Sequence, residues 1–176
     1  MRLIIALVIL AQPSFALSVQ AKASVNHVTQ PTIDAGSALA EMRQMVGLWK
    51  PADKPQSPLR IRFYLTADDT VLVESWEVRG QPHSLTLYHL DGASLLATHY
   101  CPQGNQPRLR LMGRDASGLH FALRDVTDLD PASETHQHDL WIDLANPGMP
   151  VRSEIYASTE GIGVQERLPL VRADQE

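Results

Sequence analysis

The sequence lacks several features on which common protein classes depend. Its single cysteine, Cys101, excludes an internal disulfide. Fifteen basic residues against 20 acidic ones give a formal net charge of −5, so the basic footprint of a nucleic-acid-binding protein is missing. There is no phosphate-binding P-loop, complete dinucleotide glycine set, Gly-X-Ser-X-Gly, Cys-X-X-Cys or calcium loop. These absences argue against the most common enzyme classes.

The only long apolar run lies at the N-terminus. Arg2 precedes the apolar stretch 3–11, and small residues follow it in the spacing that signal peptidase recognises. The run is too short for a membrane-spanning helix, and no cysteine near it supports a lipid anchor. We therefore predict a signal peptide over residues 1–23, cleaved near Ala21 or Ala23, and a periplasmic or secreted mature protein. Residues 24–33 are interpreted as a flexible lead-in, and 34–172 as one domain.

One helix is predicted, followed only by strands. Asp34 suits an N-cap, and the apolar positions after it have helical spacing, which predicts a helix from Ala35 to Met45 that Gly47 ends. The rest alternates with period two. The predicted strands are 59–65, 70–78, 83–90, 93–101, 107–113, 118–126, 136–144, 150–158 and 161–172.

Short turns join these nine or ten strands, so neighbours are expected to be antiparallel. Closing such a meander removes its two edges, which favours an up-and-down β-barrel with one helix at one end. A two-layer sandwich is the alternative, although only 127–135 offers the longer crossing it needs. With Asp91 and Gly92 as hairpin loop residues, Tyr88 is expected to face Leu95, and His83 to face Tyr100.

Two stretches resemble a known family. Gly47-Leu48-Trp49, between helix and first strand, is similar to the Gly-X-Trp signature of lipocalins and other calycins. This resemblance implies that Trp49 closes the barrel floor and stacks on a basic residue of the last strand, Arg167 or Arg172. The run "LYHLDGASLLATHYCPQGNQPRLRL" (87–111) resembles exported bacterial calycin-like proteins of undefined function, which implies the barrel but no activity.

Several strands carry polar residues among apolar ones, and this mixture is typical of a ligand cavity rather than a packed core. Glu74 is either a buried acid–base group or the partner of Arg108, Arg110 or Arg152 in a salt bridge. The predicted ligand-binding residues are Glu74, Trp76, Tyr88, His89, His99, Tyr100, Cys101, Asn105 and Arg108.

Two further hypotheses concern reactive or metal-binding side chains. His99 and Cys101 share a strand face and form either a nucleophile pair or a buried thiol beside a structural histidine. His136 and His138 share a face and either hold a transition metal, with Glu74, His99 or Glu154 as third ligand, or belong to a polar strand start. Haem held by one histidine is a variant without a supporting motif.

Three functions remain open from the sequence. The first is an exported barrel that binds a small, partly apolar molecule, without nucleic-acid partners or a membrane span. The second is an enzyme in the same cavity, an isomerase or hydrolase built on Glu74, His99 and Tyr100. The third is a filled barrel that acts as an interaction module. The sequence indicates neither the ligand nor the oligomeric state.

Overall fold

The computed structural model describes residues 33–174. The predicted signal peptide, its cleavage site and most of the lead-in lie outside these residues. No helix within the described part is long and apolar enough to cross a membrane. The elements are α1 (Ala35–Met42), η1 (Arg43–Met45), β1 (Gly47–Pro51), β2 (Leu59–Thr66), β3 (Val71–Val78), β4 (Gln81–Asp91), β5 (Ser94–Tyr100), β6 (Gln106–Asp115), β7 (Gly118–Thr127), β8 (His136–Asp143), β9 (Val151–Ser158), β10 (Gly161–Ile162) and β11 (Glu166–Arg172).

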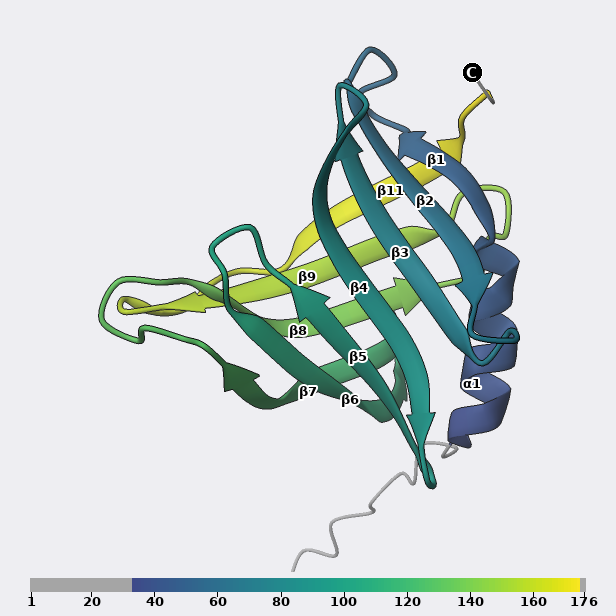
Figure 1. The fold of residues 1–176 in the computed structure, drawn as a ribbon. Coiled ribbons are helices and arrows are strands. Elements are labelled where there is room, and N and C mark those ends of the chain that lie inside the picture. Colours follow the sequence, from purple (N-terminus) through teal and green to yellow (C-terminus); the bar gives the residue numbers. More distant parts are fainter. Residues whose placement is uncertain (1–32, 175–176) are drawn as a thin grey trace, which may run out of the picture.

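The strands form a closed antiparallel barrel (Figure 1). Strands β1 to β8 pair in chain order, β8 pairs with β9, β9 with β11, and β11 with β1. Of the eleven strands in the sheet, the two-residue β10 pairs only with β9, which leaves ten in the closed ring. The predicted barrel with one N-terminal helical segment is thus confirmed. Closure satisfies the backbone groups that an open meander leaves at its edges.

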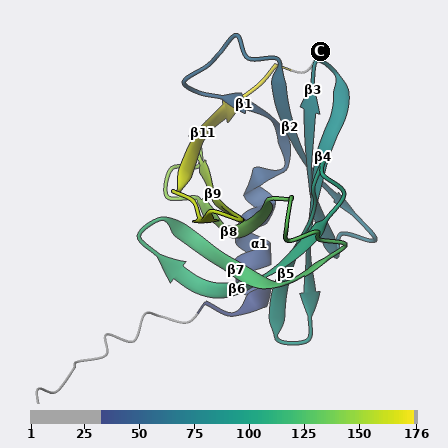
Figure 2. The ribbon, with the colours of Figure 1, turned by 90° about the vertical axis from the view of Figure 1, so that its left-hand side faces the viewer.

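The helix closes one end of the barrel. The Asp34 carboxylate caps α1 by accepting from the Ser37 backbone N–H at 2.9 Å, as predicted. Leu39, Met42 and Met45 belong to the same buried cluster as the inward-facing strand residues. In Figure 2 the helix is seen through the ring of strands, across the far end.

The Gly-X-Trp segment builds this floor. Trp49 is fully buried, and its indole N–H donates to the Met45 carbonyl at 2.6 Å. The Arg172 guanidinium lies 4.0 Å from the centre of the Trp49 ring and donates to the Val46 carbonyl at 2.6 Å. Gly47 has φ of +136°, and a Cβ there would collide with Arg172. Of the two candidate basic partners, Arg172 is therefore the one that stacks.

The barrel interior has an apolar half and a polar half. Next to the helix, the strands contribute a cluster of apolar side chains that includes Phe63, Leu95 and Phe121, all almost completely buried. At the opposite end, the turns between β1 and β2, β3 and β4, β5 and β6, and β7 and β8 surround what we call the mouth. Close to the mouth the interior becomes polar, with buried Glu74, His99 and Arg152.

Three details differ from the prediction. Gly47–Pro51 is a strand of its own, because it pairs with both β2 and β11, and 161–172 is divided into β10 and β11. In the hairpin, Asp91 pairs with Ser94, so the loop begins at Gly92. Tyr88 therefore pairs with Ala97 rather than Leu95, and Tyr100 pairs with Leu85 rather than His83, so both expected pairs were wrong by two residues. An even shift preserves which residues share a face.

Candidate functional site

The β4–β5 hairpin places three polar side chains inside the barrel. Thr86 pairs with His99, and Tyr88 pairs with Ala97, so these residues point to the same side of the sheet. Thr86, Tyr88 and His99 are all buried, which shows that this side faces the interior. The hairpin therefore presents its hydroxyl groups and the imidazole to the space below the mouth.

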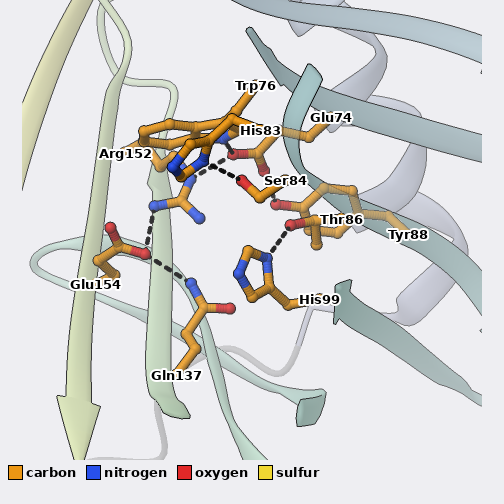
Figure 3. Close-up of polar contacts among 10 residues, drawn as sticks. All are labelled: Glu74, Trp76, His83, Ser84, Thr86, Tyr88, His99, Gln137, Arg152 and Glu154. Carbon is orange, nitrogen blue, oxygen red and sulfur yellow. Dashed lines mark hydrogen bonds and ion pairs between the residues drawn. The ribbon is translucent and has the colours of Figure 1, made fainter. Parts of the chain in front are cut away.

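A buried carboxylate lies at the centre of the polar half. Glu74 on β3 accepts hydrogen bonds from Trp76 Nε1, Tyr88 Oη and Arg152 Nε, each at 2.5 Å (Figure 3). The Glu74 side chain is 0% exposed and that of Arg152 is 2% exposed. The salt bridge between Glu74 and Arg152, one of the alternatives from the sequence, is thus the one present. Burial, and then the negative charge of Glu74, raise the pKa of the Tyr88 hydroxyl well above its usual value.

Arg152 connects this carboxylate to a second one. Its Nη1 lies 2.8 Å from Glu154 Oε2, which also accepts from Gln137 Nε2 at 2.8 Å. Burial alone would raise the pKa of Glu154, but the charge and hydrogen bonds of Arg152 and the Gln137 hydrogen bond outweigh it and lower this pKa. Glu154 and the guanidinium therefore stay charged at neutral pH, with the guanidinium also 4.9 Å from the Trp76 ring centre.

His99 is held as a neutral ring. Burial, and next the positive charge of Arg152, lower its pKa to about 4. Its Nδ1 lies 2.9 Å from the Thr86 hydroxyl, and its buried Nε2 has no partner among the described residues. The Thr86 hydroxyl proton needs an acceptor, and the His99 ring is the neighbour to which it can donate. We therefore assign Thr86 as the donor to Nδ1. The ring proton then lies on Nε2, which becomes an unused hydrogen-bond donor.

Two adjoining cavities open at this point. The inner cavity, of about 140 Å³, is lined by Trp76, His83, Ser84, His99, Pro102, Arg152, Glu154 and Tyr156. The outer cavity, of about 230 Å³, is lined by Asp53, Lys54, Leu59, Trp76, Arg152, Glu154, Glu166, Arg167 and Leu168. Trp76, Arg152 and Glu154 belong to both linings. The ionic network therefore forms the wall that the two cavities share, and His99 lines only the inner one.

The predicted site residues separate into three groups. Glu74, Trp76, Tyr88 and His99 gather in the polar half of the barrel. His89 and Tyr100 occupy the opposite face of the hairpin, where Tyr100 is 44% exposed. Arg108 also lies on the outer wall, paired with Asp125 at 2.5 Å. Cys101 and Asn105 lie in the β5–β6 turn at the rim, and both residues are buried.

The rim residues have structural partners. Asn105 Nδ2 donates to Glu134 Oε2 at 3.0 Å and to the Thr135 carbonyl at 3.1 Å, which ties the β5–β6 turn to the loop before β8. Cys101 has a buried free thiol, 3.9 Å from Gln103 Nε2. The structure thus gives the thiol an amide neighbour rather than the His99 ring.

His136 and His138, at the start of β8, are not joined by a third side chain into a metal site among the described residues. The rings of His136 and His138 lie 6.5 Å apart, and His138 Nδ1 is 2.6 Å from Asp139. Within residues 33–174, no group of three or more His, Cys, Asp or Glu side chains is placed to hold a metal ion. The third ligands considered from the sequence, such as Glu74 and His99, are engaged in the network of the barrel interior.

The site contains residues that the sequence did not single out as ligand contacts. Arg152, Glu154 and Tyr156 alternate along β9, and Gln137 lies on the neighbouring β8. In the sequence, these contacts were signalled only by the charged pair Arg152 and Glu154 at alternate positions of one strand. It became meaningful only when barrel closure placed β9 opposite β3 and β5 (Figure 3).

Comparison with known proteins adds no relative: no protein-family model matches the sequence, and no significant match is found among curated proteins.

Proposed function

We propose that this protein binds a small, partly apolar molecule at the mouth of its barrel. One observation carries the proposal: the buried Nε2 of His99, without a partner among the described residues, belongs to a side chain that lines the inner cavity. A buried donor without an acceptor costs about 1–3 kcal/mol. A ligand that supplies the acceptor would recover this free energy, which favours binding at this position.

The lining also supports the partly apolar character of the ligand. Leu59, Leu168 and the Trp76 ring provide apolar surface in the outer cavity, next to the charged network. Binding sites of this kind combine a mostly apolar wall with a few placed polar groups. The floor is filled by the apolar cluster around Phe63 and Leu95, so the ligand occupies only the mouth half.

An enzyme built on Glu74, His99 and Tyr100 is less well supported. Tyr100 extends from the outer face of β5, whereas Glu74 and His99 lie inside the barrel. Glu74 already accepts three hydrogen bonds, from Trp76, Tyr88 and Arg152, which leaves little capacity for proton transfer. Binding therefore explains the arrangement better than catalysis.

Export to the periplasm or medium and kinship with calycin-like proteins belong to the same proposal. They are supported by the N-terminal sequence pattern and by a closed barrel in which Trp49 and Arg172 stack at the floor. A binding protein in such a compartment collects its ligand from the surrounding solution.

Native mass spectrometry of the protein purified from its host, before and after incubation with a metabolite extract of that host, tests the binding function. We expect a bound mass on the wild type, a reduced amount on His99→Ala, and an unchanged amount on the matched control His89→Ala, which alters the outer face of the same hairpin. A wild type that carries no bound mass in either condition contradicts the proposal.

A further inference from the structure

We infer that a groove on the outer wall of the barrel binds the phosphate group of a small phosphorylated molecule. The groove has a volume of about 370 Å³ and is lined by Leu48, Pro58, Arg60, Arg62, Glu77, Arg79 and Gly80. It shares no lining residue with the two cavities of the mouth. The inference therefore does not depend on the binding function proposed for the barrel interior.

The strand register places this groove outside the barrel. Leu48 pairs with Arg62 across β1 and β2, and Arg60 pairs with Glu77 across β2 and β3. Ile61, between the two arginines, is completely buried in the barrel core, so both arginines point outward. Leu48 is only 8% exposed although it lies on this outer face, which places it at the bottom of the groove with the charged side chains around it.

The groove is positively charged in a protein whose formal net charge is −5. Among the described residues, three guanidinium groups line it against the single carboxylate of Glu77, so three positive charges and one negative charge leave +2. Glu77 Oε1 lies 3.4 Å from Arg62 Nε, whereas Arg60 and Arg79 have no carboxylate partner within residues 33–174. Guanidinium groups bind phosphate oxygens through paired N–H donors, so this surplus of arginine favours a phosphate group.

Backbone hydrogen bonds position two of the arginines. Arg60 Nη1 donates to the carbonyls of Ser57 and Leu59, each at 2.9 Å, and its Nε and Nη2 have no partner in the described part of the chain. The Arg79 backbone N–H donates to the Pro58 carbonyl at 3.1 Å. This bond joins the β3–β4 turn to the β1–β2 loop at the same end of the barrel (Figure 1). A ligand therefore meets donors that are already in place, which lowers the entropic cost of binding.

The β3–β4 turn carries an arginine where its backbone favours other residues. Val78 pairs with Gln81, so the loop consists of Arg79 and Gly80, with φ of +54° and +71°. A two-residue turn with both φ values positive prefers Asn, Asp or Gly at its first position, because most other side chains are strained there. Turn formation does not explain Arg79, whereas contact between its guanidinium and an anion does.

The lining also indicates what carries the phosphate. A volume of about 370 Å³ lies at the lower end of the range for small-molecule sites, which favours a compact ligand over an extended polyanion. Leu48 and Pro58 provide apolar surface for the organic group of that ligand. A phosphate monoester carries about −1.5 to −2 charges at pH 7, which nearly cancels the +2 of the groove.

Titration of the ¹⁵N-labelled protein with phenyl phosphate at pH 8, followed by NMR, tests the inference. We expect saturable shifts of the Arg79 and Gly80 backbone amide signals, and no such shifts with benzylammonium, a cation of similar size. Arg79→Asn provides a residue that the turn favours but removes the cation, so phenyl phosphate should bind about fivefold more weakly while stability in urea is kept. Glu77→Gln should tighten binding, because it removes the one carboxylate of the described lining.

Arg124→Gln is the matched control, because Arg124 is a surface arginine that lines a different cavity. Its affinity for phenyl phosphate should equal that of the wild type. A loss in Arg124→Gln as large as in Arg79→Asn reveals a general charge effect and overturns the inference. The absence of saturable shifts at Arg79 and Gly80 overturns it as well.

Sedimentation with phosphatidylcholine vesicles, with and without phosphatidic acid, distinguishes a dissolved ligand from a lipid head group that carries the same phosphate monoester. We expect the protein to stay in solution with both kinds of vesicle. Binding to the phosphatidic acid vesicles that Arg79→Asn abolishes would assign the groove to a membrane surface and overturn the small-ligand inference. None of these results bears on the mouth, whose ligand the native mass spectra detect separately.

Discussion

Replacing Arg152 with methionine is the most informative perturbation of the buried network. Methionine roughly keeps the length of the side chain but removes the cation that pairs with Glu74 at 2.5 Å and Glu154 at 2.8 Å. Glu74 and Arg152 are almost fully buried, so the carboxylate left without its cation is poorly solvated. Breaking a buried pair in this way costs about 3–5 kcal/mol in free energy of unfolding.

The loss should depend on pH in a defined direction. In the wild type, the lowered pKa of Glu154 stabilises the fold above the unfolded-state pKa, and this contribution is lost as pH falls through the folded-state pKa. Without Arg152, burial remains as the main influence and raises the pKa of Glu154, so the charged form now destabilises the folded state. The stability difference between wild type and Arg152→Met is therefore largest near pH 8 and shrinks toward pH 5.

Urea unfolding at several pH values measures both effects. The exposed Arg124, 3.6 Å from Asp91, provides the control, since Arg124→Met should change stability by less than about 1 kcal/mol. The double variant Glu74→Gln with Arg152→Met should be at least about 1 kcal/mol more stable than Arg152→Met alone, because one unpaired carboxylate is gone. If Arg152→Met loses less than about 1 kcal/mol and shows no pH dependence, the reasoning is refuted.

Three further changes test the site and the frame that supports it. The pKa of His99 is about 4 in the folded state and about 6.5 in the unfolded state, so lowering the pH from 7 to 4 should reduce the free energy of unfolding by about 3 kcal/mol. In His99→Phe, the free energy of unfolding measured with urea should depend less on pH over this range. Gly118 and Gly161 have similar positive φ, but only a Cβ at Gly118 would collide with the β8 backbone; Gly118→Ala should therefore lower the midpoint of thermal unfolding clearly more than Gly161→Ala. Arg172→Met should cost about 1–3 kcal/mol in urea unfolding by removing the cation and its hydrogen bonds from the barrel floor, and similar losses in exposed Arg167→Met would contradict that assignment.

Much of the architecture follows from local pattern. The Asp34 cap and the apolar spacing after it predict the helix, and period-two alternation with short turns predicts antiparallel neighbours. These signals act over a few residues, so a single sequence displays them directly. The details that failed depend on distant partners. Gly47–Pro51 is a strand because β2 and β11 lie on either side of it, and the hairpin loop moved by one residue at Gly92 without changing either face.

The site likewise has a part that the sequence indicates and a part that only the closed barrel decides. The polar residues Glu74, Tyr88 and His99 stand out in the sequence because they interrupt apolar strands, and the sequence alone offers several partners for Glu74. Only the closed barrel decides that Arg152, 78 positions away, takes that place. The reason is physical: the alternation along a strand determines which residues share a face, whereas the pairing of β9 with β8 and β11 determines which faces meet inside the barrel. The His99 nitrogen and the Gln137 oxygen that find no partner within residues 33–174 are buried only because the barrel closes around them.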